Sequence, residues 1–234
     1  MRMALPILMS VPHAGLRVPE IMASACLLSP AQIAKDGDEH AAAIYDIASE
    51  VKHYVTTDVA RAVVDLNRAE DDRRPDGVVK THTCFKAPVW REPLDEQVVE
   101  ALLAAHHRPY HASLTELARR DVGLAVDCHT MLAVGPPIGP GPGQERPHVC
   151  LGNADGTCPE QWMVCLSRSF REQFGPRVTV NAPFRGGYIT RSHAGEMPWV
   201  QLELSRAPFA TDLEKRARVL RALQAALECI DALR

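Results

Sequence analysis

The chain has 234 residues, a formal net charge of -3, and a composition that is 46% hydrophobic but only 5% aromatic. This length predicts a single domain over residues 1–234, with enough apolar residues for a sizeable aliphatic core. Charges of both signs are spread along the chain, which argues against a basic nucleic-acid-binding surface or a polybasic membrane tail. We therefore expect neither a nucleic-acid nor a membrane partner.

The apolar run near the N-terminus is short, contains Pro6, and lacks a small-x-small cleavage site after it, so it indicates a buried strand rather than a signal peptide. No segment approaches the roughly 18 apolar residues of a membrane span. The seven cysteines are irregularly spaced and form no CxxC pair, a pattern typical of small buried residues in a reducing compartment. These features predict a cytoplasmic protein.

Apolar runs that are typical of buried strands alternate with helical patterns along most of the chain. Strands are predicted at residues 5–11, 54–57, 62–66, 123–128, 148–151, 177–180 and 200–204. Helices are predicted at residues 38–51, 94–121 with an interruption near Arg108-Pro109, 159–174, and 211–233 with Thr211 as N-cap. Long loops are predicted at residues 69–93 and at 133–147, which holds five prolines and four glycines. This order favours an α/β fold with a mostly parallel sheet.

Polar side chains lie at the ends of four of the predicted strands. Ligands of open α/β sheets bind at the carboxyl ends of the strands, so these side chains are candidates for a common site. They are found in the segments Pro12-His13, Asp65-Leu66-Asn67-Arg68, Asp127-Cys128-His129 and Gln201-Leu202-Glu203. Their coincidence indicates a catalytic crevice.

Two histidines and one carboxylate, with an open fourth position, are the usual ligands of a hydrolytic zinc ion. The candidate histidines are His13 and His129, and Asp127 lies where a carboxylate can orient the His129 imidazole. Leu16 occupies the position at which a compact His-x-x-Glu motif would supply the carboxylate. The third ligand is therefore sought in the segment 36–40, whose alternative interpretation is a helix N-cap.

Glu203 has apolar neighbours on both sides in a predicted buried strand, where a carboxylate is costly unless it has a partner or a role. It could be a general base, or alternatively the ion-pair partner of Arg206 or another arginine. Arg61, Arg68 and Arg191 could bind substrate carboxylates through their guanidinium forks, although each alone is more typical of a surface residue.

Eight stretches, in the expected order and spanning nearly the whole chain, together resemble the N-formylglutamate amidohydrolase (N-formylglutamate deformylase) family. That family is similar to the zinc carboxypeptidases and the aspartoacylase-like deacylases. The stretches are Ser10–Gly15, Asp36–His40, Val64–Arg68, Arg108–His111, Asp127–Thr130, Leu151–Gly156, Asn181–Arg191 and Gln201–Leu204.

The resemblance implies one catalytic domain with a three-layer α/β fold, in which helices flank a central, mostly parallel mixed sheet as in zinc carboxypeptidases. It implies one zinc ion bound by His13, Asp38 and His129, with Asp36 and His40 as rivals of Asp38. By the same resemblance Glu203 is the general base and Arg61 polarises the scissile carbonyl. The residues implied to hold substrate carboxylate are Asn67, Arg68 and Arg191.

The implied reaction is hydrolysis of N-formyl-L-glutamate to formate and L-glutamate, the last step of one histidine-degradation route. An alternative with the same residues is a deacylase of another N-acyl amino acid, such as N-acyl-aspartate. A second alternative is a non-catalytic, zinc-stabilised carboxylate-binding protein. The expected partner is thus a small acidic molecule, and the chain could be a monomer or a homodimer.

Overall fold

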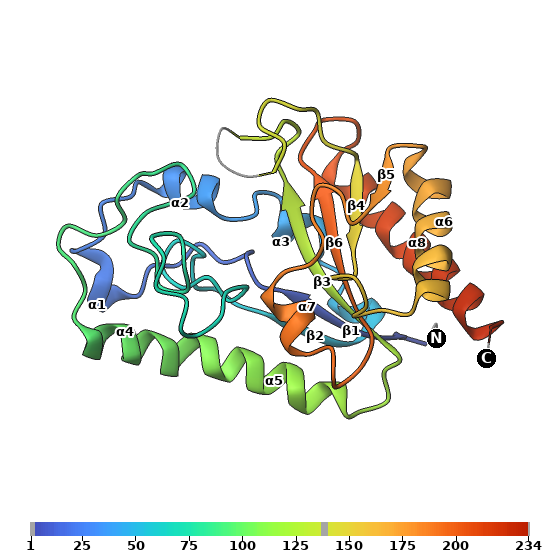
Figure 1. The fold of residues 1–234 in the computed structure, drawn as a ribbon, viewed down its shortest axis with the longest axis horizontal. Coiled ribbons are helices and arrows are strands. Elements are labelled where there is room, and N and C mark those ends of the chain that lie inside the picture. The colour runs from blue at the N-terminus through green and yellow to red at the C-terminus, as the bar shows by residue number, and fades with distance from the viewer. Residues whose placement is uncertain (1–2, 137–139, 234) are drawn as a thin grey trace.

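A six-stranded mixed sheet lies at the centre of the computed structural model, which describes residues 3–136 and 140–233 (Figure 1). The strands follow one another across the sheet in the order β2-β1-β3-β6-β4-β5. The pairing of β4 with β6 is antiparallel, and the other pairings between these strands are parallel. Their bounds are β1 Leu5–Val11, β2 Val51–Thr56, β3 Leu124–Met131, β4 Val149–Gly152, β5 Val178–Val180 and β6 Trp199–Ser205.

Helices cover both faces of the sheet, which confirms the predicted three-layer α/β fold (Figure 1). In Figure 1, α6 and α8 lie to the right of the sheet, and α4 and α5 run along its lower left. The helices are α1 Glu20–Ala23, α2 Pro30–Asp36, α3 Ala41–Ile44, α4 Glu96–Leu102, α5 Arg108–Ala118, α6 Glu160–Phe174, α7 Tyr188–Ser192 and α8 Asp212–Asp231. None of the described helices is long and apolar enough to cross a membrane.

The two faces of β3 show how the sheet separates core from site. Successive side chains of a strand point to opposite faces. Val126 and Cys128 belong to the core cluster that β3 shares with α6 and α8, whereas Ala125 belongs to the cluster shared with α5. Asp127 and His129 therefore lie on the α5 side, at the carboxyl end of the strand.

The closing helix α8 begins as the sequence predicts. The Thr211 hydroxyl accepts a hydrogen bond from the Glu214 amide at 3.2 Å, and the Glu214 carboxylate accepts one from the Thr211 amide at 2.8 Å. This capping box satisfies two amides of the first turn. One face of the helix is then buried at Val219, Ala222, Leu223, Ala226, Leu227 and Ile230.

The predicted helix at 94–121 is interrupted, as expected, near its proline. A π-helical turn at Leu103–His107 joins α4 to α5, and Pro109 lies in the first turn of α5. Proline lacks the amide that a continuous helix would use, so a wider turn accommodates it.

The strand predicted at 62–66 is wrong. These five residues are completely buried, but their backbone forms turns: the Val63 and Val64 amides both donate to the Ala60 carbonyl. The apolar run therefore reflects burial beneath the loop 69–93 and α5, not strand pairing. Burial alone produces the same pattern.

The helix predicted at 38–51 is also wrong in its length. It is limited to the single turn α3 and a 3-10 turn at Ala48–Glu50, after which β2 begins. His40 enters α3 in the left-handed conformation, with φ of 71°. The chain leaves the helix at Tyr45, whose buried hydroxyl donates a hydrogen bond to the His129 carbonyl at 2.8 Å.

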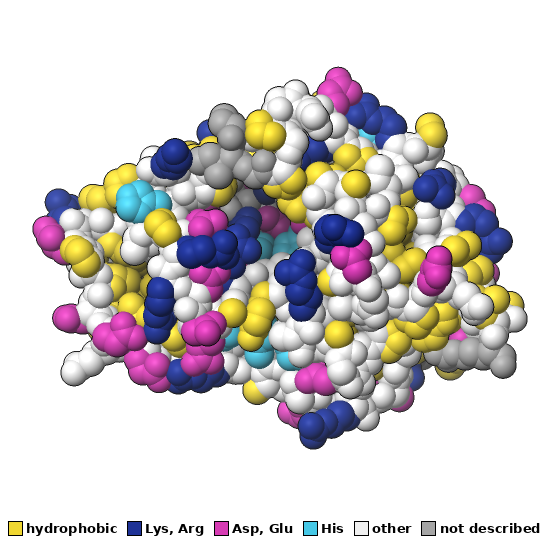
Figure 2. All heavy atoms as spheres, in the orientation of Figure 1, with side chains coloured by type: hydrophobic (Ala, Val, Ile, Leu, Met, Phe, Trp, Pro, Cys, Tyr) yellow, Lys and Arg dark blue, Asp and Glu magenta, His cyan; other side chains and the backbone are white. Residues whose placement is uncertain are grey.

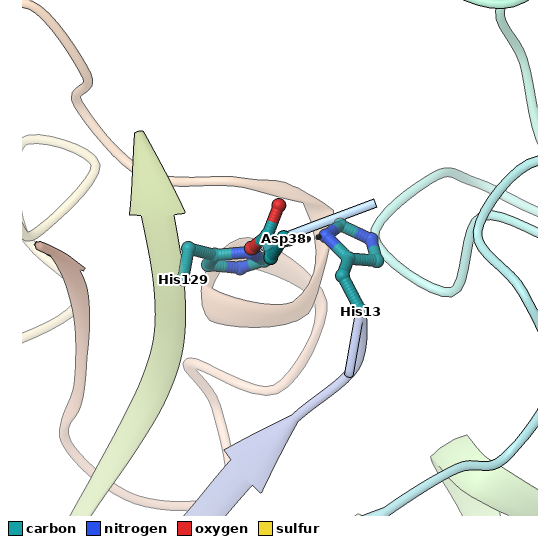
Figure 3. A group of neighbouring side chains, drawn as sticks. All are labelled: His13, Asp38 and His129. Carbon is teal, nitrogen blue, oxygen red and sulfur yellow. Dashed lines mark hydrogen bonds and ion pairs between the residues drawn. The ribbon is translucent and has the colours of Figure 1, made fainter. Parts of the chain in front are cut away.

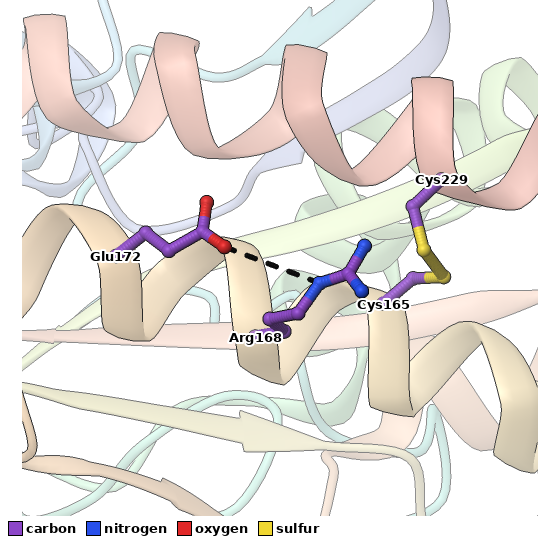
Figure 4. The surroundings of a disulfide bond; sticks show 4 residues. All are labelled: Cys165, Arg168, Glu172 and Cys229. Atoms are coloured by element: carbon purple, nitrogen blue, oxygen red, sulfur yellow. Dashed lines mark ion pairs between the residues drawn. A yellow bond between two sulfur atoms is a disulfide. The ribbon is translucent and has the colours of Figure 1, made fainter.

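Cys165 of α6 and Cys229 of α8 form a disulfide, which corrects the prediction that all the cysteines are reduced (Figure 4). The two residues are 64 positions apart, and they meet because α6 and α8 pack side by side on one face of the sheet. Cys26 and Cys84 are only partly buried. In the predicted loop 133–147, residues 137–139 lie outside the described part of the chain.

Candidate metal centre and active site

A cavity of about 790 Å³ opens at the carboxyl ends of β1, β3 and β6. Figure 2 shows it as a hollow with histidine and acidic side chains at its base and Lys and Arg side chains around it. His13, His129 and Glu203 line it, as do Arg61 and Asn67. The structure therefore brings the ends of three of the four predicted strands to one cavity, together with Asn67, which follows a buried turn instead of the fourth strand.

His13, Asp38 and His129 form a group that could hold a metal ion, with one ligand atom from each within 4.8 Å of the others (Figure 3). His13 follows β1, and His129 is on β3. The two Nδ1 atoms are 3.2 Å apart, and Asp38 Oδ2 lies 3.0 Å from His129 Nδ1 and 3.6 Å from His13 Nδ1. All three side chains are buried.

Two further aspartates hold the histidines from behind. His13 Nε2 is 2.8 Å from Asp65 Oδ1, and His129 Nε2 is 2.9 Å from Asp127 Oδ2. A carboxylate at one ring nitrogen fixes the orientation of the ring and directs the other nitrogen toward a metal. The role predicted for Asp127 fits this geometry, whereas the matching role of Asp65 was not predicted.

The charges of the group favour a cation at its centre. Burial would raise the pKa of the Asp38 carboxyl, but His13 and His129 hold that pKa well below its usual range. Burial would likewise lower the pKa of His129, but Asp127 and Asp38 hold it well above its ordinary value. The carboxylates thus favour positive charge at this place, and a bound divalent ion would take the place of the His129 proton, because a ligand imidazole is neutral.

Of the three candidates for the carboxylate ligand, only Asp38 faces the two histidines. Asp36 is buried elsewhere, where its carboxylate accepts hydrogen bonds from Lys80 Nζ and the Cys84 amide, both at 2.9 Å. His40 is exposed and pairs with Asp212. The geometry therefore favours Asp38 over its rivals.

Glu203 lies beside the group, opposite His129 in the pairing of β3 with β6. Burial raises the pKa of Glu203 to about 7, and Gln201 Nε2 donates a hydrogen bond of 2.8 Å to its carboxylate. Within residues 3–136 and 140–233 it forms no ion pair. The alternative partner Arg206 instead pairs with Glu39 at 3.2 Å. Such a carboxyl group can both accept and donate a proton near neutral pH.

Arg61 and Lys80 neutralise the aspartates beneath the group. Arg61 Nε donates to Asp65 Oδ2 at 2.9 Å, and its NH1 atom lies 3.6 Å from Asp38 Oδ1. Lys80 is 1% exposed and lies 2.9 Å from Asp36 and 3.6 Å from Asp65. Sequence analysis missed Lys80. The apolar pair Val78-Val79 that precedes it indicates burial of this part of the loop.

The three residues predicted to hold substrate carboxylate are placed differently. Asn67 lies in the cavity wall, where its Nδ2 is 3.1 Å from His129 Nε2 and its Oδ1 accepts from the Ile189 amide at 2.8 Å. Arg68 also lines the cavity and lies 3.6 Å from Asp76. Arg191 is exposed on α7 and is not among the lining residues.

Gly187 explains how α7 approaches Asn67 so closely. A Cβ atom at this position would lie 2.2 Å from Asn67 Nδ2. The absence of a side chain therefore allows the start of α7 to reach the Asn67 side chain.

Three histidines support Asn67 from the side of α5. His107 Nε2 donates to the Arg68 carbonyl at 2.9 Å, and His111 Nε2 donates to the Leu66 carbonyl at 3.0 Å, so the two bonds flank Asn67. His111 Nδ1 in turn is 2.8 Å from His193 Nε2. Burial lowers the pKa of His111 to about 3, with the neighbouring His107 and His193 adding to the effect.

Comparison with known proteins shows the family of the chain. The sequence model of the family described as N-formylglutamate amidohydrolase matches residues 5–210. The chain belongs to this family. Its relatives include the N-formylglutamate deformylase of Pseudomonas putida, which is 30% identical over 227 residues that cover 90% of this chain and 84% of the relative.

Two solved structures share the fold. An N-formylglutamate amidohydrolase from Ralstonia eutropha JMP134 superimposes with a TM-score of 0.78 at 21% identity, covering 98% of this chain and 95% of the other. A protein from Agrobacterium tumefaciens gives a TM-score of 0.77 at 18% identity, covering 98% and 90% of the two chains. The fold of this chain is thus shared with solved structures at low sequence identity.

Replacement of Lys80 with Met is expected to lower the free energy of unfolding by about 3–5 kcal/mol, because it leaves the buried Asp36 and Asp65 without their shared cation. Urea denaturation measures the change. Lys52→Met is the matched control, since Lys52 pairs with Asp121 at the surface, where ion pairs contribute little. Equal stability of the two variants would contradict the role given to Lys80.

The depressed pKa of His111 predicts acid sensitivity. Between its ordinary value of 6.5 and about 3, the unfolded chain binds a proton at His111 that the folded protein excludes. Stability from this group is therefore present above pH 6.5 and is lost as the pH falls, by up to about 1.4 kcal/mol per pH unit. The difference in unfolding free energy between wild type and His111→Gln, measured at pH 7.5 and 5, should shrink at the lower pH. A constant difference would show that His111 is not excluded from protonation.

Proposed function

We propose that the protein hydrolyses the amide bond of N-formyl-L-glutamate to give formate and L-glutamate, with one zinc ion bound by His13, Asp38 and His129. The observation that carries this proposal is the convergence of these three ligand atoms beside the buried Glu203, which forms no ion pair with any described residue. The substrate follows from membership of the family and from the name of the Pseudomonas putida relative.

The donor set suits zinc, which binds two imidazole nitrogens and one carboxylate in many hydrolytic sites and keeps a position open for water or substrate. A metal ion bound here supplies Lewis acidity, which polarises a carbonyl group and acidifies water. Three ligands from the described residues leave such an open position. The alternative of a non-catalytic, zinc-stabilised binding protein would instead need a closed site with four protein ligands.

Glu203 carries the proton in the proposed reaction. Its carboxylate accepts a proton from water as the water oxygen bonds to the formyl carbon. The same carboxyl group then donates that proton to the amide nitrogen as the carbon–nitrogen bond breaks, which gives formic acid and the amine. The acid then loses its proton, which the amine takes up, so the final products are formate and the ammonium form of glutamate. A pKa of about 7 suits both transfers, because the group changes protonation state readily near neutral pH.

Arg61 and Asn67 are placed to assist this chemistry from the cavity wall. Arg61 lies beside Asp38, and its guanidinium would stabilise negative charge that develops on the carbonyl oxygen. Asn67 contacts His129 and would offer its amide to the substrate. Arg68 remains a candidate for a substrate carboxylate, whereas the exposure of Arg191 removes it from our proposal.

The size of the cavity favours a second candidate within the same chemistry. A volume of about 790 Å³, with Phe85, Met131 and Phe184 in the wall, offers more space than a formyl group and glutamate need. A larger N-acyl group on an acidic amino acid is therefore the alternative substrate. A panel of N-formyl and N-acetyl derivatives of glutamate and aspartate separates the two.

Formate release from N-formyl-L-glutamate tests the proposal, and Glu203→Gln is the decisive variant. Removal of the proton acceptor is expected to lower kcat by about 10²–10⁴-fold while the metal content is unchanged. Glu172→Gln is the control, because Glu172 is exposed on α6 and pairs with Arg168 (Figure 4). Wild-type turnover by the Glu203 variant would refute its role, and no formate release by the wild type would refute the substrate.

A further inference from the structure

We propose that Arg146, on the loop between β3 and β4, binds a carboxylate group of the substrate. Arg146 is only 7% exposed and lines the same cavity as the metal-ligand group and Glu203. The proposal rests on the proposed function for the identity of the substrate, but the carboxylate site itself is argued from the charges of the cavity.

Arg146 differs from the other arginines of the cavity in having no anionic partner. No carboxylate among residues 3–136 and 140–233 forms an ion pair with it, whereas each of the others has one. The other pairs are Arg61 with Asp65 at 2.9 Å, Arg68 with Asp76 at 3.6 Å, Arg185 with Asp155 at 2.8 Å, and Arg206 with Glu39 at 3.2 Å. A buried guanidinium without an anion is costly, which points to a ligand that supplies the charge.

The contacts of Arg146 orient its guanidinium group but leave most of its hydrogen-bond donors without an acceptor among the described residues. One NH2 hydrogen bond of 3.4 Å reaches the Pro140 carbonyl, and the group lies over the Phe184 ring at 4.9 Å from the centroid. The Nε atom is buried and has no hydrogen-bond partner among the residues that the structure describes. An arginine fork binds a carboxylate through two parallel N–H groups, and most donors of this guanidinium are left without an acceptor among the described residues.

The electrostatics of the cavity agree with an anion at this place. Burial lowers the pKa of Arg146; the charge of Glu203 opposes that effect, and the charge of Arg206 adds to it. A negatively charged ligand between these guanidinium groups would offset the repulsion. Arg146 and Glu203 both line the cavity, so the proposed carboxylate site lies in the same cavity as the proposed general base.

The proposed substrate has an α-carboxylate and a side-chain carboxylate, and a guanidinium group could bind either one. N-formylglutamine lacks the side-chain charge, and the α-amide of N-formylglutamate lacks the other. The wild type should prefer N-formylglutamate over whichever amide removes the carboxylate that Arg146 binds. That preference should disappear in Arg146→Met, and its position identifies the carboxylate.

The test measures binding as well as turnover. Zinc-loaded wild type, Arg146→Met and Arg146→Lys are titrated with glutarate by calorimetry, and KM and kcat are measured for N-formyl-L-glutamate and the two amides. Loss of a charge-assisted pair should raise the glutarate Kd and the KM by about 10- to 100-fold in Arg146→Met, with kcat little changed. Arg146→Lys, which keeps the charge but not the fork, should lie between wild type and Arg146→Met.

Arg168→Met is the control, since Arg168 is exposed on α6, pairs with Glu172, and is not among the residues that line the cavity. Wild-type glutarate affinity and KM in Arg146→Met would overturn the proposal, as would a retained preference for the acid over both amides. If Arg146→Met does not fold, the same measurements on Arg146→Lys test the proposal, and a wild-type glutarate Kd and KM in that variant would overturn it. Should the wild type release no formate, glutarate binding that depends on Arg146 would still support the carboxylate site while the proposed function fails.

Discussion

The hydrogen bonds from Asp65 and Asp127 to the outer nitrogens of His13 and His129 determine the arrangement of the whole site. Because each Nε2 is held at 2.8–2.9 Å by a buried carboxylate, both rings direct Nδ1 toward Asp38. Such anchoring gives a metal site its orientation before the metal binds. The buried charge that results must be neutralised, and Lys80 and Arg61 meet that need from outside the sheet.

The sequence predicted the parts of the site that the sheet itself positions. His13, His129 and Glu203 were found because apolar runs marked their strands correctly and because parallel strands end at one edge. The choice between Asp36 and Asp38 was different, since both lie in one segment before α3 and both are buried. Contacts with the distant Lys80 and Cys84, which hold Asp36, separate their roles.

The errors arose where contacts between distant segments decide the local structure. Residues 62–66 are as apolar as a strand because they are buried beneath other elements, and no local pattern distinguishes the two cases. Cys165 and Cys229 meet only through the packing of α6 on α8. Arg146 follows a loop rich in proline and glycine and has no sequence signal, so its isolation from every described carboxylate is visible only in the folded cavity.

The claim that His13, Asp38 and His129 hold one metal ion is tested most directly by the zinc content of the purified protein, determined by mass spectrometry after extensive dialysis. The account predicts one zinc per chain in the wild type and in His40→Asn, whose histidine is exposed and outside the group, and little zinc in His129→Asn. Stoichiometric zinc in His129→Asn, or an active wild type that contains no metal, would contradict it.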